Sequence, residues 1–252
     1  NFKPLDRSGY KEYGTRGDTV VKRLDFNMKK PFAPLIRAHV GPYSSAADRL
    51  DSVREFASWA KYLAQTGYLD ILSIGTSQLS QSNFGEDWED KPNGGGVPIN
   101  SPEEYRMIWE ASRPLLLRTY AGTKNIPQLA EMYEETINIC WHALSLWWFN
   151  KLDHRGPYDL YTNLQQHVEA LKYIAKTKKP FEANVSHHFA FRGADDATYI
   201  VSAYLAAKLA KKMGISTFIL QNMLNTPRST WGVQDLAKSR ALLSLIRELE
   251  DS

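Results

Sequence analysis

Short apolar runs rich in β-branched and aromatic residues alternate along this chain with longer segments in which apolar residues recur every three or four positions. The short runs predict buried strands, and the longer segments predict amphipathic helices. Capping signals agree with this division, since Ser45 or Asp48 is placed to cap a helix predicted over residues 46–65. The predicted strands cover residues 31–40, 69–76, 114–120, 136–145, 180–191 and 216–223.

The predicted strands at 69–76 and 114–120 enclose a long polar, glycine-rich loop and one helix. A strand, a crossover helix and a second strand in this order imply parallel pairing. About six such units follow one another, and this regularity favours a TIM-type (β/α) barrel over a doubly wound sheet. We therefore predict an α/β fold with a barrel in residues 31–252, incomplete in this chain because a closed barrel has eight units. Residues 1–30 are predicted to form an N-terminal arm with little regular structure.

The composition is that of an ordinary globular protein, with 43% apolar and 23% charged residues. The net charge is only +3 and the lysines and arginines are scattered, so we expect no nucleic-acid partner. The single cysteine, Cys140, excludes an internal disulfide framework and suits a reducing compartment, which predicts a cytoplasmic protein. No apolar run approaches the ~20 residues that span a bilayer, so we expect no membrane partner.

Two arginines, Arg37 and Arg118, stand inside otherwise apolar predicted strands. A buried guanidinium needs a fixed anionic partner, because an unpaired buried charge is strongly destabilising. The partner is either an internal acid, such as Asp70 or Glu182, or a ligand whose carboxylate or phosphate the guanidinium holds bidentately. The presence of two arginines on different strands favours the ligand.

Other polar residues gather near the carboxyl ends of predicted strands, where parallel α/β folds place their chemistry. His187 and His188 are adjacent on a predicted strand, so one should face the barrel interior and the other the helices. Their roles stay open between core packing and acid–base chemistry. No spacing such as HxH supports a metal site, and none is predicted. The candidates near these strand ends are Ser80, Gln81, Asn83, Tyr120, His142, His188 and Asn222.

Three consecutive glycines, Gly94, Gly95 and Gly96, lie in the long loop after the second predicted strand. They allow a backbone to approach a ligand closely or a loop to move. Their surroundings lack the spacing of a P-loop or of a dinucleotide-binding GxGxxG turn. Acidic residues are scarce at the predicted strand ends, which argues against glycosidase or magnesium-dependent chemistry.

Four segments of the chain together resemble the barrel subunit of adenosylcobalamin-dependent mutases. They are RAHVG with Arg37, QSNFGEDWEDKPNGGGVPIN, LLRTYAGT with Arg118, and LAEMYEETINICWHALS. The similarity is closest to the catalytic subunit of glutamate (methylaspartate) mutase and, through GGVPI, to the ornithine and lysine aminomutases. It is colinear over roughly residues 30–245.

This resemblance implies a barrel that caps the corrin face of adenosylcobalamin, with the cofactor carried by a separate Rossmann-like subunit in a hetero-oligomer. It implies a radical 1,2-rearrangement of a small molecule that bears a carboxylate. Arg118 matches an arginine that grips the substrate carboxylate in glutamate mutase, and Arg37 matches one near the boundary between cobalamin and substrate. In this hypothesis His142, His188 and Tyr120 are catalytic, Ser80, Gln81, Asn83 and Asn222 contact the substrate, and Gly94, Gly95 and Gly96 contact the cofactor.

The chain also departs from glutamate mutase. Where that enzyme has another substrate arginine after strand two, this chain has Ser80, Gln81 and Asn83, and where it has a glutamate base after strand four, this chain has Trp141 and His142. Glutamate is therefore not the expected substrate. The cobalamin-carrier signature DxHxxG is absent, so the carrier is expected on a partner. Pyridoxal phosphate ranks below adenosylcobalamin, because its anchoring lysine would also have to come from elsewhere.

Two other functions stay open at this point. One is a TIM-barrel lyase or isomerase without cobalamin, in which His142 or His188 is a base that titrates at about pH 6–7. The other is a non-catalytic barrel subunit of a larger complex. Turnover by the isolated chain would favour the lyase or isomerase. If substitutions of Arg37 and Arg118 left the activity of the assembled complex unchanged, the non-catalytic subunit would be favoured.

Overall fold

The computed structural model describes residues 3–29, 32–41, 48–91, 93–226 and 229–250. The chain divides into two compact units. Unit 1 comprises Asn1–Lys124 and Glu131–Trp141, and unit 2 comprises Asn125–Ala130 and His142–Ser252. Each unit contains a three-stranded parallel sheet with helices in the connections, so the predicted α/β class is confirmed.

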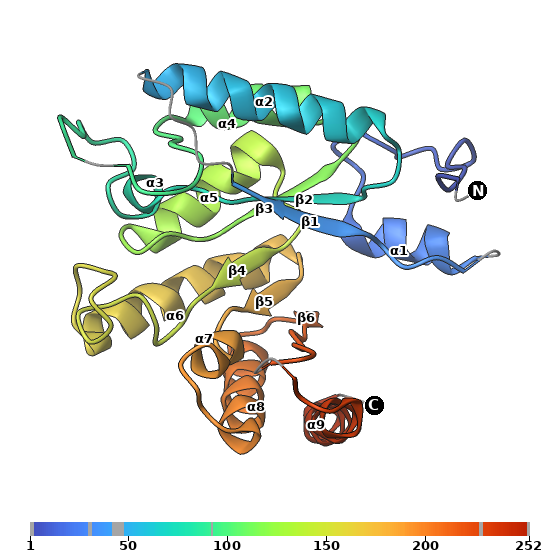
Figure 1. Cartoon of the computed structure of the whole chain (residues 1–252), viewed down its shortest axis with the longest axis vertical. Coiled ribbons are helices and arrows are strands. Elements are labelled where there is room, and N and C mark those ends of the chain that lie inside the picture. Colours follow the sequence, from blue (N-terminus) through green and yellow to red (C-terminus); the bar gives the residue numbers. More distant parts are fainter. Residues whose placement is uncertain (1–2, 30–31, 42–47, 92, 227–228, 251–252) are drawn as a thin grey trace. The chain divides into compact units, whose positions relative to one another are not determined.

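The sheet of unit 1 consists of β1 (Arg37–Val40), β2 (Ile71–Ile74) and β3 (Leu116–Thr119), which lie side by side in this order (Figure 1). Every pairing in it is parallel, as the crossover pattern predicts. The helices of this unit are α1 (Val20–Met28), α2 (Arg49–Gln65), α3 (Gln78–Ser82), α4 (Pro102–Ala111) and the part of α5 (Ile126–Ile137) that begins at Glu131.

Local signals explain where the two long helices of unit 1 begin and which side they bury. Asp48 caps α2 by accepting from the backbone N–H groups of Leu50 and Asp51, while the other predicted cap, Ser45, lies outside the described residues. Ser101 caps α4, which has a proline at its first position. The buried apolar residues of α2 recur at the spacing of one helix face: Val53, Phe56, Ala57, Ala60 and Ala64.

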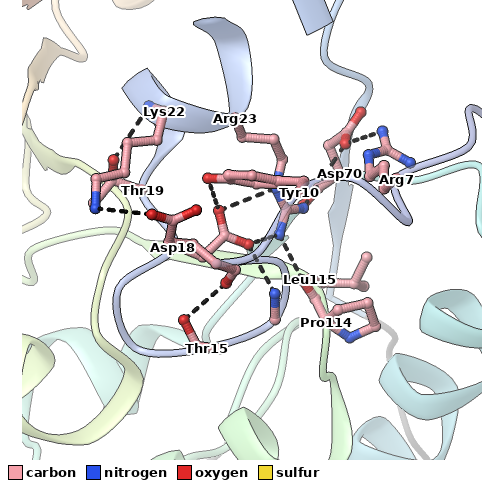
Figure 2. Close-up of polar contacts among 12 residues, drawn as sticks. Arg7, Tyr10, Thr15, Asp18, Thr19, Lys22, Arg23, Asp70, Pro114 and Leu115 are labelled. Carbon is pink, nitrogen blue, oxygen red and sulfur yellow. Dashed lines mark hydrogen bonds and ion pairs between the residues drawn. The ribbon is translucent and has the colours of Figure 1, made fainter. Parts of the chain in front are cut away.

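The amino-terminal segment is not the irregular arm that the sequence predicts. It contains α1, and the guanidinium of Arg23 on this helix is fully buried. Arg23 forms an ion pair with Asp18, approaches the carboxylate of Asp70 at 3.8 Å, and donates to the carbonyl oxygens of Asp70 (2.9 Å) and Pro114 (2.8 Å) (Figure 2). Arg7 completes the group by pairing with Asp70.

These contacts attach the amino-terminal segment to the start of two strands, because Asp70 directly precedes β2 and Pro114 lies two residues before β3. Asp70, which the sequence offered as an internal partner for Arg37 or Arg118, pairs here with Arg7 and Arg23. The prediction of an irregular arm failed because the charges that anchor it lie far apart in sequence.

The sheet of unit 2 consists of β4 (His142–Leu144), β5 (Phe181–Ala183) and β6 (Phe218–Ile219), again parallel and in chain order. Its helices are α6 (Leu160–Thr177), α7 (Ser186–Ala190), α8 (Asp196–Lys212) and α9 (Gly232–Arg247). Between α8 and α9, Tyr199, Ala203 and Leu242 form a buried apolar cluster. The hydroxyl of Tyr199 donates to the carbonyl oxygen of Gln221 after β6 (2.8 Å), which ties α8 to the end of that strand.

Two predicted strands of unit 2 are much shorter than their apolar runs. The run at 136–145 begins inside α5, which extends to Ile137, and Asn138 then takes a left-handed conformation (φ 45°), so the strand starts only at His142. The run at 180–191 is extended only as far as Ala183, and its aromatic second half forms α7. Short apolar runs do not distinguish a buried strand from a buried helical turn.

The barrel stays a prediction, because the described strands form two separate three-stranded sheets. The division of the chain at residue 30 also stays a prediction, although the described residues before it belong to unit 1. Within the described ranges, no helix combines the length and the apolar character that crossing a membrane requires.

The buried charges around Arg23 make the first testable prediction. Arg23→Met removes the cation but leaves the carboxylate of Asp18 buried, so we expect the variant to lose about 3–5 kcal/mol of unfolding free energy in urea titrations. The matched control is Arg54→Met, whose exposed pair with Asp51 should contribute no more than about 1 kcal/mol. Equal urea midpoints for Arg23→Met and the unaltered chain would contradict the anchoring role.

Candidate functional site

One face of the unit 1 sheet carries a row of polar residues. The parallel register places His39 beside Ser73 and Ser73 beside Arg118, so these three residues form one row across β1, β2 and β3 on the same face. Their neighbours along the strands point to the opposite face and are apolar except at one position: Ala38, Val40, Leu72, Ile74, Leu117 and Thr119. A polar row inside otherwise apolar strands is the arrangement expected of a binding face.

Arg118 provides a buried positive charge in this row, as the sequence predicts. Its side chain is only 1% exposed, and its guanidinium carbon lies 4.5 Å from the centre of the Tyr120 ring. The ring of His39 meets Tyr120 edge-on, with 5.8 Å between the ring centres. The cation–π contact fixes the plane of the guanidinium. A carboxylate is the group that such a planar fork binds best.

Ser73 belongs to the site, and sequence reasoning missed it. The residue is fully buried between His39 and Arg118, and its hydroxyl has no hydrogen-bond partner among the described residues. A buried hydroxyl without a partner is destabilising unless water or a ligand completes it. The signal was present in the sequence, because Ser73 is the one polar residue within Ile71–Ile74.

The expected burial of Arg37 is wrong. Arg37 is exposed on β1, which has a paired neighbour only on its β2 side among the described strands. Its guanidinium carbon lies 5.7 Å from the centre of the Trp141 ring. Only one of the two strand arginines is therefore buried, and the role of Arg37 beside a cofactor stays a prediction.

The carboxyl ends of β1 and β2 approach each other so closely that only glycine fits. A Cβ on Gly41 would lie 2.4 Å from the carbonyl oxygen of Gly75, and a Cβ on Gly96 would lie 2.7 Å from the same oxygen. The N–H of Val97 donates to that oxygen (2.8 Å), which holds the long loop against β2. Gly96 thus serves loop packing, and its predicted contact with the cofactor stays a prediction.

Gly94 and Gly95 differ from Gly96. Both are exposed, and nothing lies within 4 Å of a Cβ built on either residue. There is therefore open space where a side chain would lie on either residue, and their predicted contact with the cofactor stays a prediction.

Ser80 and Gln81 lie on α3, where the sequence suggested only a loop. The hydroxyl of Ser80 donates to the carbonyl oxygen of Val97 (3.1 Å), and the amide of Gln81 donates to the carbonyl oxygen of Thr76 (3.0 Å). Both side chains fix the loop to the end of β2. Their predicted contact with substrate stays a prediction, and the contacts described are structural.

Asn83 has a similar structural role just after α3. The side-chain amide of Asn83 donates to the carboxylate of Glu86 (2.7 Å). The indole N–H of Trp88 donates to the backbone carbonyl oxygen of Asn83 (2.8 Å). The hydrogen bond from Asn83, together with an ion pair to Lys124, lowers the pKa of Glu86. The loop that carries the glycines is thus held at several points, while Gly94 and Gly95 themselves stay uncovered.

His187 and His188 do not lie on opposite faces of a strand. Both are on α7, and their ring centres are 4.0 Å apart. The ring of Phe149 packs edge-on against His188 at 4.9 Å. Burial, reinforced by His187 and by the positive charge of Arg192, lowers the pKa of His188 to about 3, so the imidazole is neutral at neutral pH.

The other two predicted residues of unit 2 have different surroundings. His142 is buried, but it is the first residue of β4, so it lies at the amino end of the strand and not at the expected carboxyl end. Asn222 is exposed after β6, and its amide donates to the hydroxyl of Ser239 on α9 (2.8 Å). Of the predicted site residues, Arg37, Gln81, Arg118 and Tyr120 thus belong to unit 1. His142, His188 and Asn222 belong to unit 2.

Comparison with known proteins does not place the chain in a family. No family model matches it, and a search of curated proteins finds no relative. In the part of the chain that the structure describes, no three His, Cys, Asp or Glu side chains come together as a metal site.

The close approach of β1 and β2 gives a second testable prediction. A Cβ on Gly75 would meet the Cα of Gly41 at 2.9 Å and crowd the His39 ring, so Gly75→Ala should lower the unfolding free energy by about 1–3 kcal/mol. Gly95→Ala, where the added methyl meets nothing, should leave the urea midpoint unchanged. Equal midpoints for the two variants would show that the strand ends are not packed as described.

Proposed function

We propose that this chain is the catalytic barrel subunit of an adenosylcobalamin-dependent mutase that rearranges a small carboxylate. The observation that carries the proposal is the row of His39, Ser73 and Arg118 on one face of a parallel sheet. The colinear resemblance of the sequence to such subunits supports it. The residues of this row that would meet the substrate are a buried cation and a buried hydroxyl that lacks a partner among the described residues.

The proposed substrate contact begins with Arg118. Its guanidinium binds the substrate carboxylate through two parallel hydrogen bonds, while the Tyr120 ring holds it in plane. The hydroxyl of Ser73 donates a hydrogen bond to the same carboxylate, which supplies the partner that this hydroxyl lacks among the described residues. Because both groups are buried, the electrostatic attraction is stronger than it would be in water.

The residues near this row fit a large ligand with amide groups on its rim, such as a corrin. Arg37 and His39 are exposed on β1, and Gly94 and Gly95 are exposed in the loop after β2. All four can hydrogen-bond neutral amide groups. When bound on its partner subunit, adenosylcobalamin supplies the radical that removes a substrate hydrogen. The task of this chain is to orient the substrate and to exclude water.

The complete architecture in this proposal is a TIM-type barrel. Its support is the order of elements, since each described strand is parallel to its neighbour and a helix lies in every connection. The site residues come from the strands and the loops after them, as in barrel enzymes.

The reading as a cobalamin-independent lyase has less support. A general base works best with a pKa near the operating pH. The pKa of His188 is about 3, and His142 lies at the amino end of its strand. In our proposal His188 is a neutral hydrogen-bonding group.

Binding of the cofactor gives a third testable prediction. Titration of the chain with adenosylcobalamin, in the presence of a candidate carrier subunit, should change the circular dichroism of the corrin absorbance bands, because the bound ring enters a new protein environment. Arg37→Gln should weaken this binding several-fold, through loss of a charge-assisted hydrogen bond. Arg54→Gln, at an exposed arginine of α2, should bind like the unaltered chain. A flat titration for the unaltered chain would contradict the cofactor assignment.

A further inference from the structure

A cavity of about 770 Å³ lies in unit 1, at the amino end of the sheet. Its walls come from the amino-terminal segment, the end of α1, and the residues that precede β1 and β2. The site proposed above uses the strands themselves and the loops after them, so the cavity is separate from it. Its volume lies within the range of small-molecule pockets.

Asn27 is the residue that marks this cavity as a binding site. It lines the cavity from the last turn of α1 and is fully buried, yet neither the nitrogen nor the oxygen of its side-chain amide has a hydrogen-bond partner among the described residues. A carboxamide can make several hydrogen bonds, and burying one with none is destabilising. A ligand with an adjacent donor and acceptor would satisfy both atoms.

Aromatic side chains form part of the cavity wall. Phe32 and Tyr68 line it, and they are 65% and 43% exposed. Phe26 lines it as well, and its ring stacks on Tyr10 with 5.1 Å between the ring centres. Exposed aromatic faces beside a cavity bind flat ring systems well.

The charges of the lining favour an anion. Lys3 and Lys29 line the cavity, and neither is in an ion pair within the described residues. Arg7 and Asp70 neutralise each other (Figure 2). Asp6, the remaining acid, accepts a hydrogen bond from the backbone N–H of Ser8 (2.9 Å).

We propose that this cavity binds a purine nucleotide. The amide of Asn27 pairs with an edge of the base, because a purine presents a hydrogen-bond donor and an acceptor side by side. Phe32 and Tyr68 contact the ring faces, and Lys3 and Lys29 bind the phosphate. The proposal is independent of the cobalamin assignment, so either can fail alone.

The experiment is calorimetric titration of the full chain with AMP, adenosine and inorganic phosphate. We expect saturable binding of AMP, weaker binding of adenosine, and none of phosphate alone. Asn27→Leu should weaken AMP binding at least about tenfold without loss of stability towards urea, because it removes a buried polar group with no partner in the described chain. Lys29→Gln should weaken AMP binding but not adenosine binding. Lys22→Gln, on α1 outside the cavity, should change neither.

Absence of AMP and adenosine binding would overturn the proposal, as would AMP binding to Asn27→Leu at unaltered affinity. If Asn27→Leu does not fold, the proposal is tested with two variants of exposed residues, Lys29→Gln and Phe32→Ala. Unchanged AMP affinity in both Lys29→Gln and Phe32→Ala would overturn the proposal, and loss in either variant would support it.

Discussion

The buried pairing of Arg23 with Asp18 and Asp70 is the constraint on which unit 1 depends. Removing charges from water is costly, and the cost is offset only when each charge has partners of good geometry. Here the partners include the backbone just before β2 and β3, so the network ties the amino-terminal segment to the amino end of the sheet. The site that we propose for the carboxylate and the cofactor uses the strands and the loops after them.

The alternation of side chains in a strand converts this scaffold into a candidate site. Along β2 and β3, Leu72, Ile74 and Leu117 lie on one face of the sheet. Ser73 and Arg118 lie beside each other on the opposite face. Parallel register then aligns them with His39. Glycines at the strand ends allow the loop after β2 to lie against Gly75, which places Gly94 and Gly95 beyond the packed edge.

The sequence predicted features that depend on local pattern, and it failed where distant partners decide. The parallel α/β order and the burial of Arg118 follow from apolar runs and their spacing. Arg37 stands in a similar run, but its exposure depends on β1 having one paired neighbour in the described sheet. His188 lies on α7 and not on the predicted strand, and the sequence could not show this because a short aromatic run does not distinguish a strand from a helical turn. The partners of Arg23 lie up to 91 residues away, beyond the reach of pattern reasoning.

The most direct test of the central claim, that Arg118 binds a substrate carboxylate, is calorimetric titration of the chain with acetate, succinate, L-lysine and L-ornithine. We expect at least one of them to bind, and we expect Arg118→Lys to weaken its binding at least about tenfold, because lysine lacks the planar guanidinium. Arg113→Lys, at an arginine 4.7 Å above the Trp109 ring, should bind it normally. Failure of all four carboxylates to bind, or equal affinity in Arg118→Lys, would contradict the account.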